Sequence, residues 1–412
     1  MSQRDIIDHL RNMIRDMEAK RASDGDLPDF PRLPPVPRIG PGSAAAREVA
    51  PSSLETEDGE HFRVVRAVYP GGAVSELRRP PEDALPALRS LEPCLSSLDR
   101  WLYVDIETTG LTGAATVAFL VGFGEWVNGD FHIVQLFLKD RSSEEFLLEE
   151  VESRMAGRQA LVTFNGKAFD VPVLNSRFTM CGLRPPAVPD AHLDLLSLVR
   201  NMGRRPEYGQ SLKEAIRRFT GTVRDGDIPG HLIPALYFIY ERDEDASILE
   251  PVMKHNRLDI LDMACLVWVL SHVVSGEAQA GDAHALGGAG KLHLRKGNLD
   301  LARRCLETAL QSLPGAAADV AYQKRLLGQV LRRQGDWKGA AEAWEQVVAS
   351  GQAKDDDYLW LARCYELGSG DVAKSKEVVC TAVSRHEDRG EEPPPSLLRR
   401  LRRLNRRLPP TA

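Results

Sequence analysis

Between residues 61 and 275, apolar and polar positions follow the pattern of an α/β protein. Five short runs have the apolar, β-branched and aromatic composition of strands: 61–69, 101–107, 117–127, 131–138 and 160–164. Asn128-Gly129-Asp130 predicts a hairpin between the third run and the fourth. Helical spacing predicts three helices: 144–157 behind a capping box of Ser142 and Glu145, 168–182, and 251–275. Hairpins followed by alternating strands and helices predict a mixed sheet flanked by helices.

Different patterns occur on both sides of this region. Residues 5–22 predict one amphipathic helix, and six prolines between Pro28 and Pro41 predict an extended linker. Beyond residue 280 small and apolar residues recur 38 positions apart: Gly290, Ala302 and Leu306, then Gly328, Ala340 and Trp344. They resemble the tetratricopeptide pattern, in which small residues let paired helices approach closely. An irregular helical bundle is the alternative.

The predicted organisation has five parts. They are an N-terminal helix with linker (1–44), a lead-in segment (45–98), an α/β domain (99–275), tetratricopeptide-like repeats (280–395) and a basic tail (396–412). The tail carries six arginines between Arg399 and Arg407, which would either contact phosphates or lie on a helix that caps the repeats through Leu397 and Leu401.

Composition argues against several classes of protein: disulfide-rich, zinc-containing, secreted and membrane-spanning ones. The 53 Lys and Arg against 59 Asp and Glu give a net charge of −6, which neither favours nor excludes a nucleic-acid ligand. The six cysteines are scattered without a C-x-x-C pair, so neither a disulfide framework nor a structural zinc site is expected. The charged N-terminus lacks the apolar core of a secretory signal, and we expect no membrane span. These features predict a cytoplasmic protein.

Four carboxylates and one histidine are the candidate catalytic residues. Asp105 and Glu107 lie two apart on a predicted strand, so both point to one face, where a divalent cation would relieve their repulsion. Taken alone, such a pair is typical of a solvated strand end. Asp170 falls in the first turn of a predicted helix, a position that the helix dipole also favours. His255 and Asp259 share one helix face at a spacing of four.

Other polar residues have a less specific pattern. Asp262 competes with Asp259, but one turn further along it would lie away from His255. His192 with Asp194 would either support the site or form a polar cap, and Asp227 would either support the site or shape its loop. Six arginines between the second and third candidate segments would contact phosphates or form a solvated face: Arg200, Arg204, Arg205, Arg217, Arg218 and Arg224. The GGAGK stretch ending at Lys291 lacks the first glycine and the Ser/Thr of a phosphate-binding loop, so we reject that interpretation.

Five sequence segments, taken in order, resemble a known family. DIETTG and TFNGKAFD resemble the first two motifs of the DEDD exonuclease branch of the ribonuclease H-like superfamily, in which a helical H-x-x-x-D follows. HLDLL, DIPG and HNRLD are similar to segments of its YprB-like subfamily. The combination resembles most the YprB-like subfamily, in which tetratricopeptide repeats often follow the nuclease domain. The resemblance covers about residues 60–275 strongly and the repeats loosely.

The resemblance implies an activity and a ligand set. Asp105, Glu107, Asp170 and Asp259 would hold two Mg²⁺ or Mn²⁺ ions for 3′→5′ exonucleolytic hydrolysis of DNA or RNA, with His255 as the base that assists the water. His255 lies four residues before Asp259, the spacing of the tyrosine type, which makes its role less secure. The repeats would bind a protein partner. Endonuclease action stays open, and the alternative is a catalytically inactive nucleic-acid-binding or scaffold protein.

Overall fold

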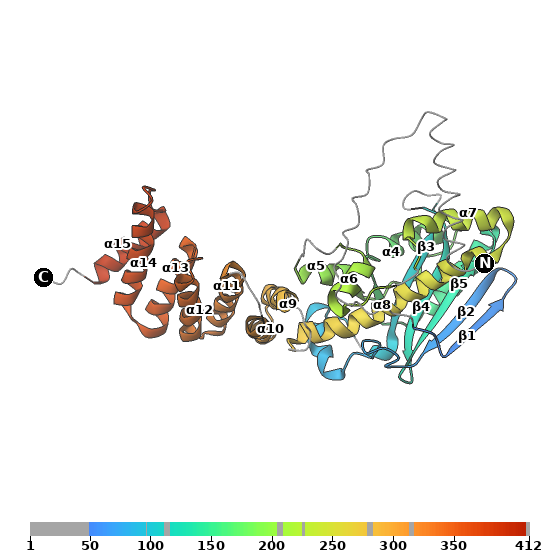
Figure 1. Ribbon diagram of the computed structural model, residues 1–412, viewed down its shortest axis with the longest axis horizontal. Coiled ribbons are helices and arrows are strands. Elements are labelled where there is room, and N and C mark those ends of the chain that lie inside the picture. The colour runs from blue at the N-terminus through green and yellow to red at the C-terminus, as the bar shows by residue number, and fades with distance from the viewer. Residues whose placement is uncertain are drawn as a thin grey trace, which may run out of the picture. The chain divides into compact units, whose positions relative to one another are not determined.

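The computed structural model describes residues 49–95, 97–110, 116–203, 209–224, 227–277, 283–312 and 317–408. The predicted N-terminal helix and the proline-rich linker lie outside these residues. Contacts divide the described chain into two compact units. The first consists of residues 49–79, 94–197 and 209–268, and the second of residues 80–93, 198–203 and 269–408 (Figure 1).

A seven-stranded mixed sheet forms the first unit, in the order β1-β2-β5-β4-β3-β6-β7. Its strands are β1 (Ser53–Asp58), β2 (Phe62–Tyr69), β3 (Trp101–Thr108), β4 (Ala118–Val127), β5 (Asp130–Leu138), β6 (Ala160–Thr163) and β7 (Ala191–Asp194). Neighbours from β1 to β3 pair antiparallel, whereas β3, β6 and β7 run parallel. The mixed sheet is therefore confirmed. Sequence reasoning missed β1 because the edge strand SLETED is exposed throughout and has no apolar side to detect.

The β4–β5 connection forms as predicted. Asn128 and Gly129 both adopt positive φ, 51° and 95°, which a tight two-residue hairpin turn requires. The predicted capping box before the next helix is wrong. Ser142 lies inside a 3₁₀ turn, Arg141–Ser143, and its backbone N–H donates to the Asp140 side chain at 2.7 Å. Asp140 reaches that amide because it occupies the N-cap of the 3₁₀ turn.

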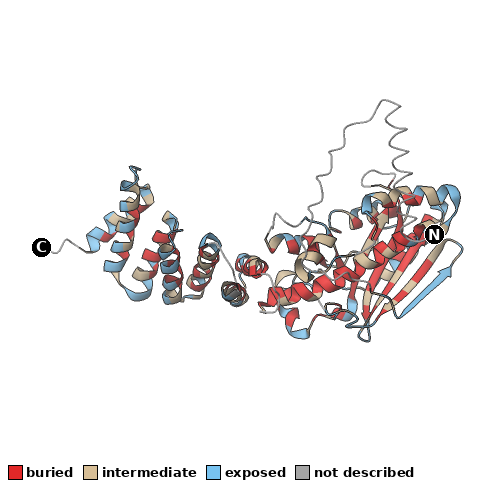
Figure 2. Ribbon diagram, in the orientation of Figure 1, coloured by how far each residue is buried: buried red, intermediate tan, exposed pale blue. Residues whose placement is uncertain are grey.

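Helices of the first unit flank the sheet: α3 (Glu144–Met155), α4 (Asp170–Met180), α6 (Leu212–Thr220) and α7 (Ile233–Asp243). The helices α5 (Leu195–Asn201) and α8 (Glu250–Ser275) begin in the first unit and end in the second, and α2 (Leu85–Leu91) belongs to the second. By length and composition the segment Ala246–Ser275 would suffice to cross a membrane, but 78% of its apolar window is buried. Buried positions run along α8 and the central strands (Figure 2). The apolar side chains of α8 therefore form the protein core.

Close contact between α8 and the sheet depends on two strand glycines. A methyl group at Gly122 would overlap the side chains of Asn256 and Ile260, and one at Gly124 would overlap Ile260 and Phe131. Glycine inside a strand weakens it but allows another element to approach closely. Here it brings the polar side of α8 against β4.

The rest of the second unit is helical. It contains α9 (Ala283–Lys296), α10 (Leu299–Ser312), α11 (Ala317–Gln334), α12 (Trp337–Ala349), α13 (Asp355–Cys364), α14 (Val372–Glu387) and α15 (Pro395–Arg407). Gly290 abuts Leu306, and a Cβ on Gly328 would lie 3.1 Å from the Trp344 ring, so small residues do permit close helix contacts at these positions. The tetratricopeptide assignment itself stays a prediction. GGAGK lies within α9, as expected for a stretch that is not a phosphate-binding loop.

The basic tail continues as helix α15. Leu397 and Leu404 are fully buried in an apolar cluster with residues of α13 and α14. Arg400, Arg403 and Arg407 form ion pairs with Glu366 at 2.5–3.0 Å. Of the two interpretations of the tail, the capping helix is the one that this packing favours.

Candidate active site

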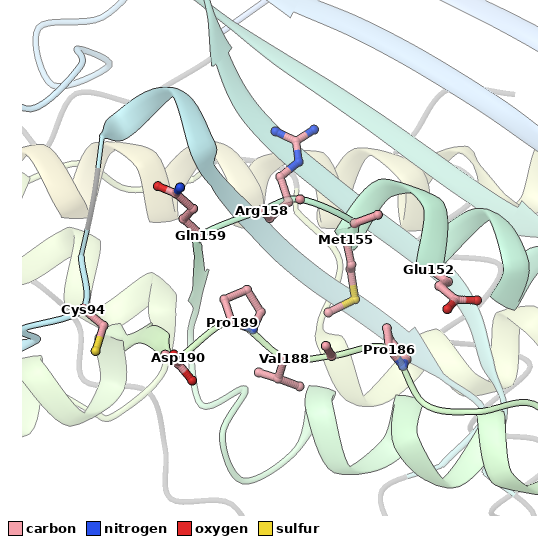
Figure 3. Close-up of a pocket in the computed structure, with 12 residues that line it drawn as sticks. Cys94, Glu152, Met155, Arg158, Gln159, Pro186, Val188, Pro189 and Asp190 are labelled. Atoms are coloured by element: carbon pink, nitrogen blue, oxygen red, sulfur yellow. The ribbon is translucent and has the colours of Figure 1, made fainter.

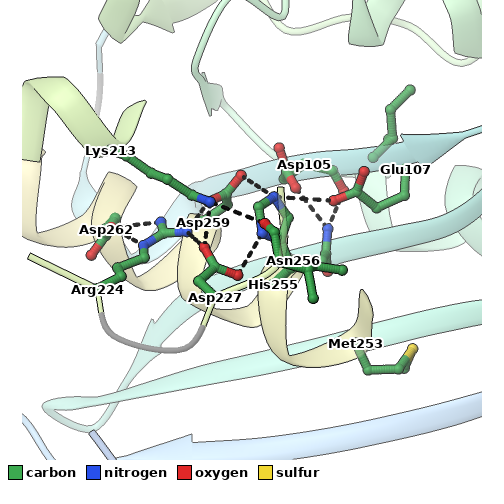
Figure 4. Close-up of polar contacts among 12 residues, drawn as sticks. Asp105, Glu107, Lys213, Arg224, Asp227, Met253, His255, Asn256, Asp259 and Asp262 are labelled. Carbon is green, nitrogen blue, oxygen red and sulfur yellow. Dashed lines mark hydrogen bonds and ion pairs between the residues drawn. The ribbon is translucent and has the colours of Figure 1, made fainter. Parts of the chain in front are cut away.

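All five predicted site residues meet at one end of the sheet. Asp105 and Glu107 lie near the carboxyl end of β3, and His255 and Asp259 lie on α8 (Figure 4). Asp170 is the first residue of α4. His255 Nε2 is 3.9 Å from Glu107 Oε1 and 3.6 Å from Asp259 Oδ2. The carboxyl ends of parallel strands are the usual ligand-binding edge of such sheets.

Strand geometry explains the first two carboxylates. Asp105 and Glu107 are partly exposed, whereas Ile106 between them is buried on the opposite face. Asp170 contacts this strand directly, because its Oδ1 accepts a hydrogen bond from the Ile106 backbone N–H at 3.2 Å. This hydrogen bond connects the DIETTG motif on β3 with the TFNGKAFD motif at the start of α4.

Asp194, at the end of β7, organises the turn that precedes Asp170. It accepts hydrogen bonds from the backbone N–H groups of Asn165, Lys167 and Leu196 at 2.9–3.2 Å. Asn165 has a φ of 72°, so the turn includes an unfavourable backbone conformation that these bonds help to maintain. The bond from Leu196, in the first turn of α5, agrees with the predicted polar cap, and the other two bonds shape the loop before Asp170.

His192 contacts the end of strand β6, next to the same turn, and is not part of the carboxylate cluster. Its Nε2 lies 2.8 Å from the Thr163 hydroxyl at the end of β6. Burial, together with the nearby charge of Lys167, lowers the pKa of His192 to about 4. This imidazole is neutral at physiological pH and links two parallel strands.

A buried amide network that sequence reasoning missed orients Asp105. Asn256 Nδ2 donates to Asp105 Oδ2 at 2.7 Å, and Asn256 Oδ1 accepts from Gln135 Nε2 at 2.7 Å. Gln135 also donates to the Met253 carbonyl at 2.9 Å and accepts from Arg257 at 3.0 Å. The available signal was a glutamine inside the apolar strand FHIVQLFL, because a buried amide needs partners.

His255 is oriented by a second missed contact. Its Nδ1 lies 2.7 Å from Asp227 Oδ1, in the DIPG segment. Lys213 Nζ also contacts Asp227, at 2.7 Å from Oδ2. Burial alone would raise the pKa of Asp227, but the hydrogen bonds from His255 and Lys213 and the charge of Arg224 hold it well below its usual value. An ionised Asp227 accepts a hydrogen bond from Nδ1–H of His255 and leaves Nε2 directed at the carboxylates.

Arg224 bridges three acidic side chains. It contacts Asp227 at 3.0 Å and both Asp259 and Asp262 at 2.5 Å. Its side chain is only 5% exposed, so the predicted phosphate contact or solvated face is wrong for this arginine. Asp262 pairs with Arg224, in agreement with its expected direction away from His255. Arg204 and Arg205 lie outside the described residues.

Unbalanced negative charge characterises the cluster. Burial raises the pKa of Asp105 and of Glu107 well above their usual values, and the neighbouring carboxylates raise both further. Burial likewise raises the pKa of Asp170 to about 7. Groups that repel one another in this way are typical of functional sites.

The donor set fits hard divalent cations. Six carboxyl groups gather around two basic side chains, Arg224 and Lys213, so full ionisation of all six would leave an excess of four negative charges: Asp105, Glu107, Asp170, Asp227, Asp259 and Asp262. Carboxylate oxygens are the ligands that Mg²⁺ and Mn²⁺ prefer. Among the described residues no group of three or more acidic, His or Cys side chains already has the spacing of a metal shell. One reason is that Arg224 holds Asp259.

A cavity of about 650 Å³ lies elsewhere in the first unit (Figure 3). It is lined by residues that precede β6 and β7, including Gln159 and Asp190, and by the end of α3. These are the amino ends of the parallel strands, opposite to the end that carries the carboxylates. The cavity therefore does not belong to the candidate active site.

Comparisons with known proteins agree with the fold. Residues 102–271 match the RNase H superfamily, and the mixed sheet with flanking helices has the corresponding ribonuclease H-like fold. The chain is 27% identical over 310 residues to the uncharacterized protein YprB of Bacillus subtilis strain 168, covering 74% of each protein. A family B DNA polymerase from the archaeon Pyrobaculum calidifontis aligns at 16% identity and a TM-score of 0.34. That alignment covers 57% of this chain but only 29% of the polymerase.

Proposed function

We propose that this chain is a metal-dependent nuclease of the YprB-like type that hydrolyses phosphodiester bonds from the 3′ end of a strand. The observation that carries the proposal is the meeting of four carboxylates from β3, α4 and α8 at one end of the sheet, with His255 Nε2 beside two of them, Glu107 and Asp259. The similarity of residues 102–271 to the RNase H superfamily supports the same chemistry.

Asp105, Glu107, Asp170 and Asp259 are the residues that would hold the ions. Two bound Mg²⁺ or Mn²⁺ ions would lower the pKa of the attacking water and stabilise charge on the leaving oxygen. Asn256 fixes the Asp105 carboxylate for this purpose through its 2.7 Å hydrogen bond. Arg224 must share or release Asp259, because the two are in direct contact in the structure.

His255 is the residue that would accept the proton of the water. With Asp227 bound to Nδ1, the neutral imidazole presents its lone pair at Nε2, on the side of Glu107 and Asp259. Asp227 would also stabilise the imidazolium that forms. This arrangement supports the role of His255 despite its unusual spacing from Asp259.

The proposal is tested with oligonucleotides labelled at either the 5′ or the 3′ end. Single- and double-stranded DNA and RNA are incubated with Mg²⁺, Mn²⁺ or EDTA, and products are resolved by length. We expect metal-dependent release of single nucleotides from the 3′ end. Intact substrates under every condition would favour the inactive scaffold, and internal fragments would indicate an endonuclease.

A further inference from the structure

A basic cavity in the second unit has features of a nucleotide-binding site. It has a volume of about 390 Å³ and lies between α9, the end of α5 and α11. Ligand pockets usually fall between about 300 and 1,000 Å³. We define this basic pocket by its polar lining: Arg200, Lys291, Arg295, Asp319, Tyr322 and Gln323.

Positive charge dominates the pocket. Among the described residues that line the pocket, three are Arg or Lys (Arg200, Lys291 and Arg295) and one is acidic (Asp319). Lys291 and Arg295 are exposed and lie four residues apart on α9, so their side chains share one face of that helix. Two adjacent cations on a rigid helix suit the phosphates of a nucleic-acid strand.

An aromatic ring borders the same cations. Tyr322 on α11 is 42% exposed, and Lys291 Nζ lies 5.7 Å from the centroid of its ring. A solvated basic surface has no need of an exposed aromatic side chain. Bases of single strands stack on such rings while neighbouring Lys and Arg contact the backbone.

The floor of the pocket offers a hydrogen-bond acceptor. Gln323 is 5% exposed, and its Oε1 has no hydrogen-bond donor among the described residues. Gly287 leaves the space for this amide, because a methyl group there would overlap Gln323. Every nucleobase in a single strand carries an N–H donor on an edge that stacking leaves accessible. A base that displaces the atoms covering this oxygen would satisfy it.

We propose that the basic pocket binds a nucleotide of a single nucleic-acid strand, so that the helical unit contributes to substrate binding. The inference rests on the proposed function only in taking nucleic acid as the ligand. Phosphates would contact Lys291 and Arg295, a base would stack on Tyr322, and its edge would donate to Gln323. An acidic peptide would use the cations alone.

Binding is measured in EDTA with full-length protein carrying Glu107→Gln, so that no cleavage occurs. The probes are fluorescein-labelled dT12 and rU12, and anisotropy is followed over a range of salt concentrations. Without metal the carboxylate cluster repels phosphates, and binding therefore reports other surfaces. Lys291, Arg295 and Tyr322 are exposed, so their substitution leaves the core intact. Lys338→Ala, an exposed charge on α12, is the matched control.

We expect Lys291→Ala with Arg295→Ala to lower the slope of log affinity against log salt by about 1.4, or roughly 0.7 per phosphate contact. Tyr322→Leu should weaken binding by about 5- to 150-fold, the range for lost base stacking, without changing that slope. The Lys338→Ala control should match the parent, and the preferred probe identifies DNA or RNA.

Affinities and slopes equal to those of Lys338→Ala in all variants would overturn the proposal. Displacement of the oligonucleotide by polyglutamate at equal charge concentration would also overturn it, since the pocket would then select charge alone. Cleavage of a four-nucleotide substrate by the wild-type protein with Mn²⁺ is measured separately. That assay tests the proposed nuclease activity whatever the pocket binds.

Discussion

Replacing Asp170 by asparagine should stabilise the metal-free protein at neutral and alkaline pH. Asp170 is 5% exposed and lies among other carboxylates, which is why its pKa rises from 3.8 to about 7 on folding. Asparagine removes the charge but keeps an oxygen that can accept the hydrogen bond of the Ile106 N–H. The variant thus removes the buried negative charge and its repulsion with the neighbouring carboxylates, while the Ile106 N–H keeps a hydrogen-bond acceptor.

The size and sign of the effect follow from this pKa. A carboxyl whose pKa is raised takes up protons on folding, so stability falls as pH rises from the unfolded to the folded pKa. The rise from 3.8 to about 7 corresponds to about 4 kcal/mol at 1.36 kcal/mol per unit, reached above pH 7. At pH 4.5 the same reasoning gives about 1 kcal/mol. Asp170→Asn should remove this pH-dependent cost.

Differential scanning calorimetry in EDTA measures the effect. The transition of the first unit is identified as the one that Mg²⁺ shifts in the wild type. A gain of about 4 kcal/mol would raise its Tm by about 8–16 °C at pH 8, for a unit of this size. With saturating Mg²⁺ the order should reverse, because the variant lacks one ligand. Asp190→Asn, an exposed carboxylate in the same unit, is the control.

Two results would refute this reasoning. Asp170→Asn could instead lower Tm equally at pH 4.5 and pH 8. The ionised Asp170 would then be stabilised by its surroundings and not destabilised by burial and by neighbouring negative charges. If Mg²⁺ stabilised the variant as much as the wild type, Asp170 would not be a ligand.

Three further substitutions test the supporting residues. His255→Ala should lower the cleavage rate by about 10²–10⁴-fold and leave metal-induced stabilisation intact; a wild-type rate across pH 6–9 would make His255 structural. Asp227→Asn should reduce kcat and alter its pH profile while KM changes little, because Asp227 orients Nδ1 of His255; an unchanged profile would assign Asp227 to the loop alone. Gly122→Ala should destabilise the first unit by about 1–3 kcal/mol in urea denaturation, since the methyl group overlaps Asn256. Gly110→Ala, whose Cβ would lie 3.8 Å from Thr116, is its control, and equal stability of the two variants would contradict the packing argument.

The sheet and the five site residues were predictable because local signals for them are strong. Asp105 and Glu107 follow the period of a strand, and His255 and Asp259 follow that of a helix. Their motifs occur in the order that the family resemblance requires. Exposed β1 had no such signal, and Ser142 was misassigned because Asp140 also offers a capping oxygen.

The residues that support the site could not be predicted from spacing alone. Gln135 and Asn256 lie 121 positions apart and form a pair only because α8 packs on β4 and β5. Arg224 belongs to a run of arginines that a sequence cannot separate into buried and solvated members. Long-range pairings of this kind depend on tertiary packing, which local periodicity does not encode.

The central claim is that the carboxylate cluster binds divalent metal, and calorimetric titration with Mn²⁺ tests it most directly. Wild-type protein and Asp190→Asn should bind with the same isotherm and a stoichiometry of two ions. Asp105→Asn should lose most of the binding heat, because the pair formed with Glu107 on β3 is broken. Identical isotherms for wild type and Asp105→Asn would contradict the account.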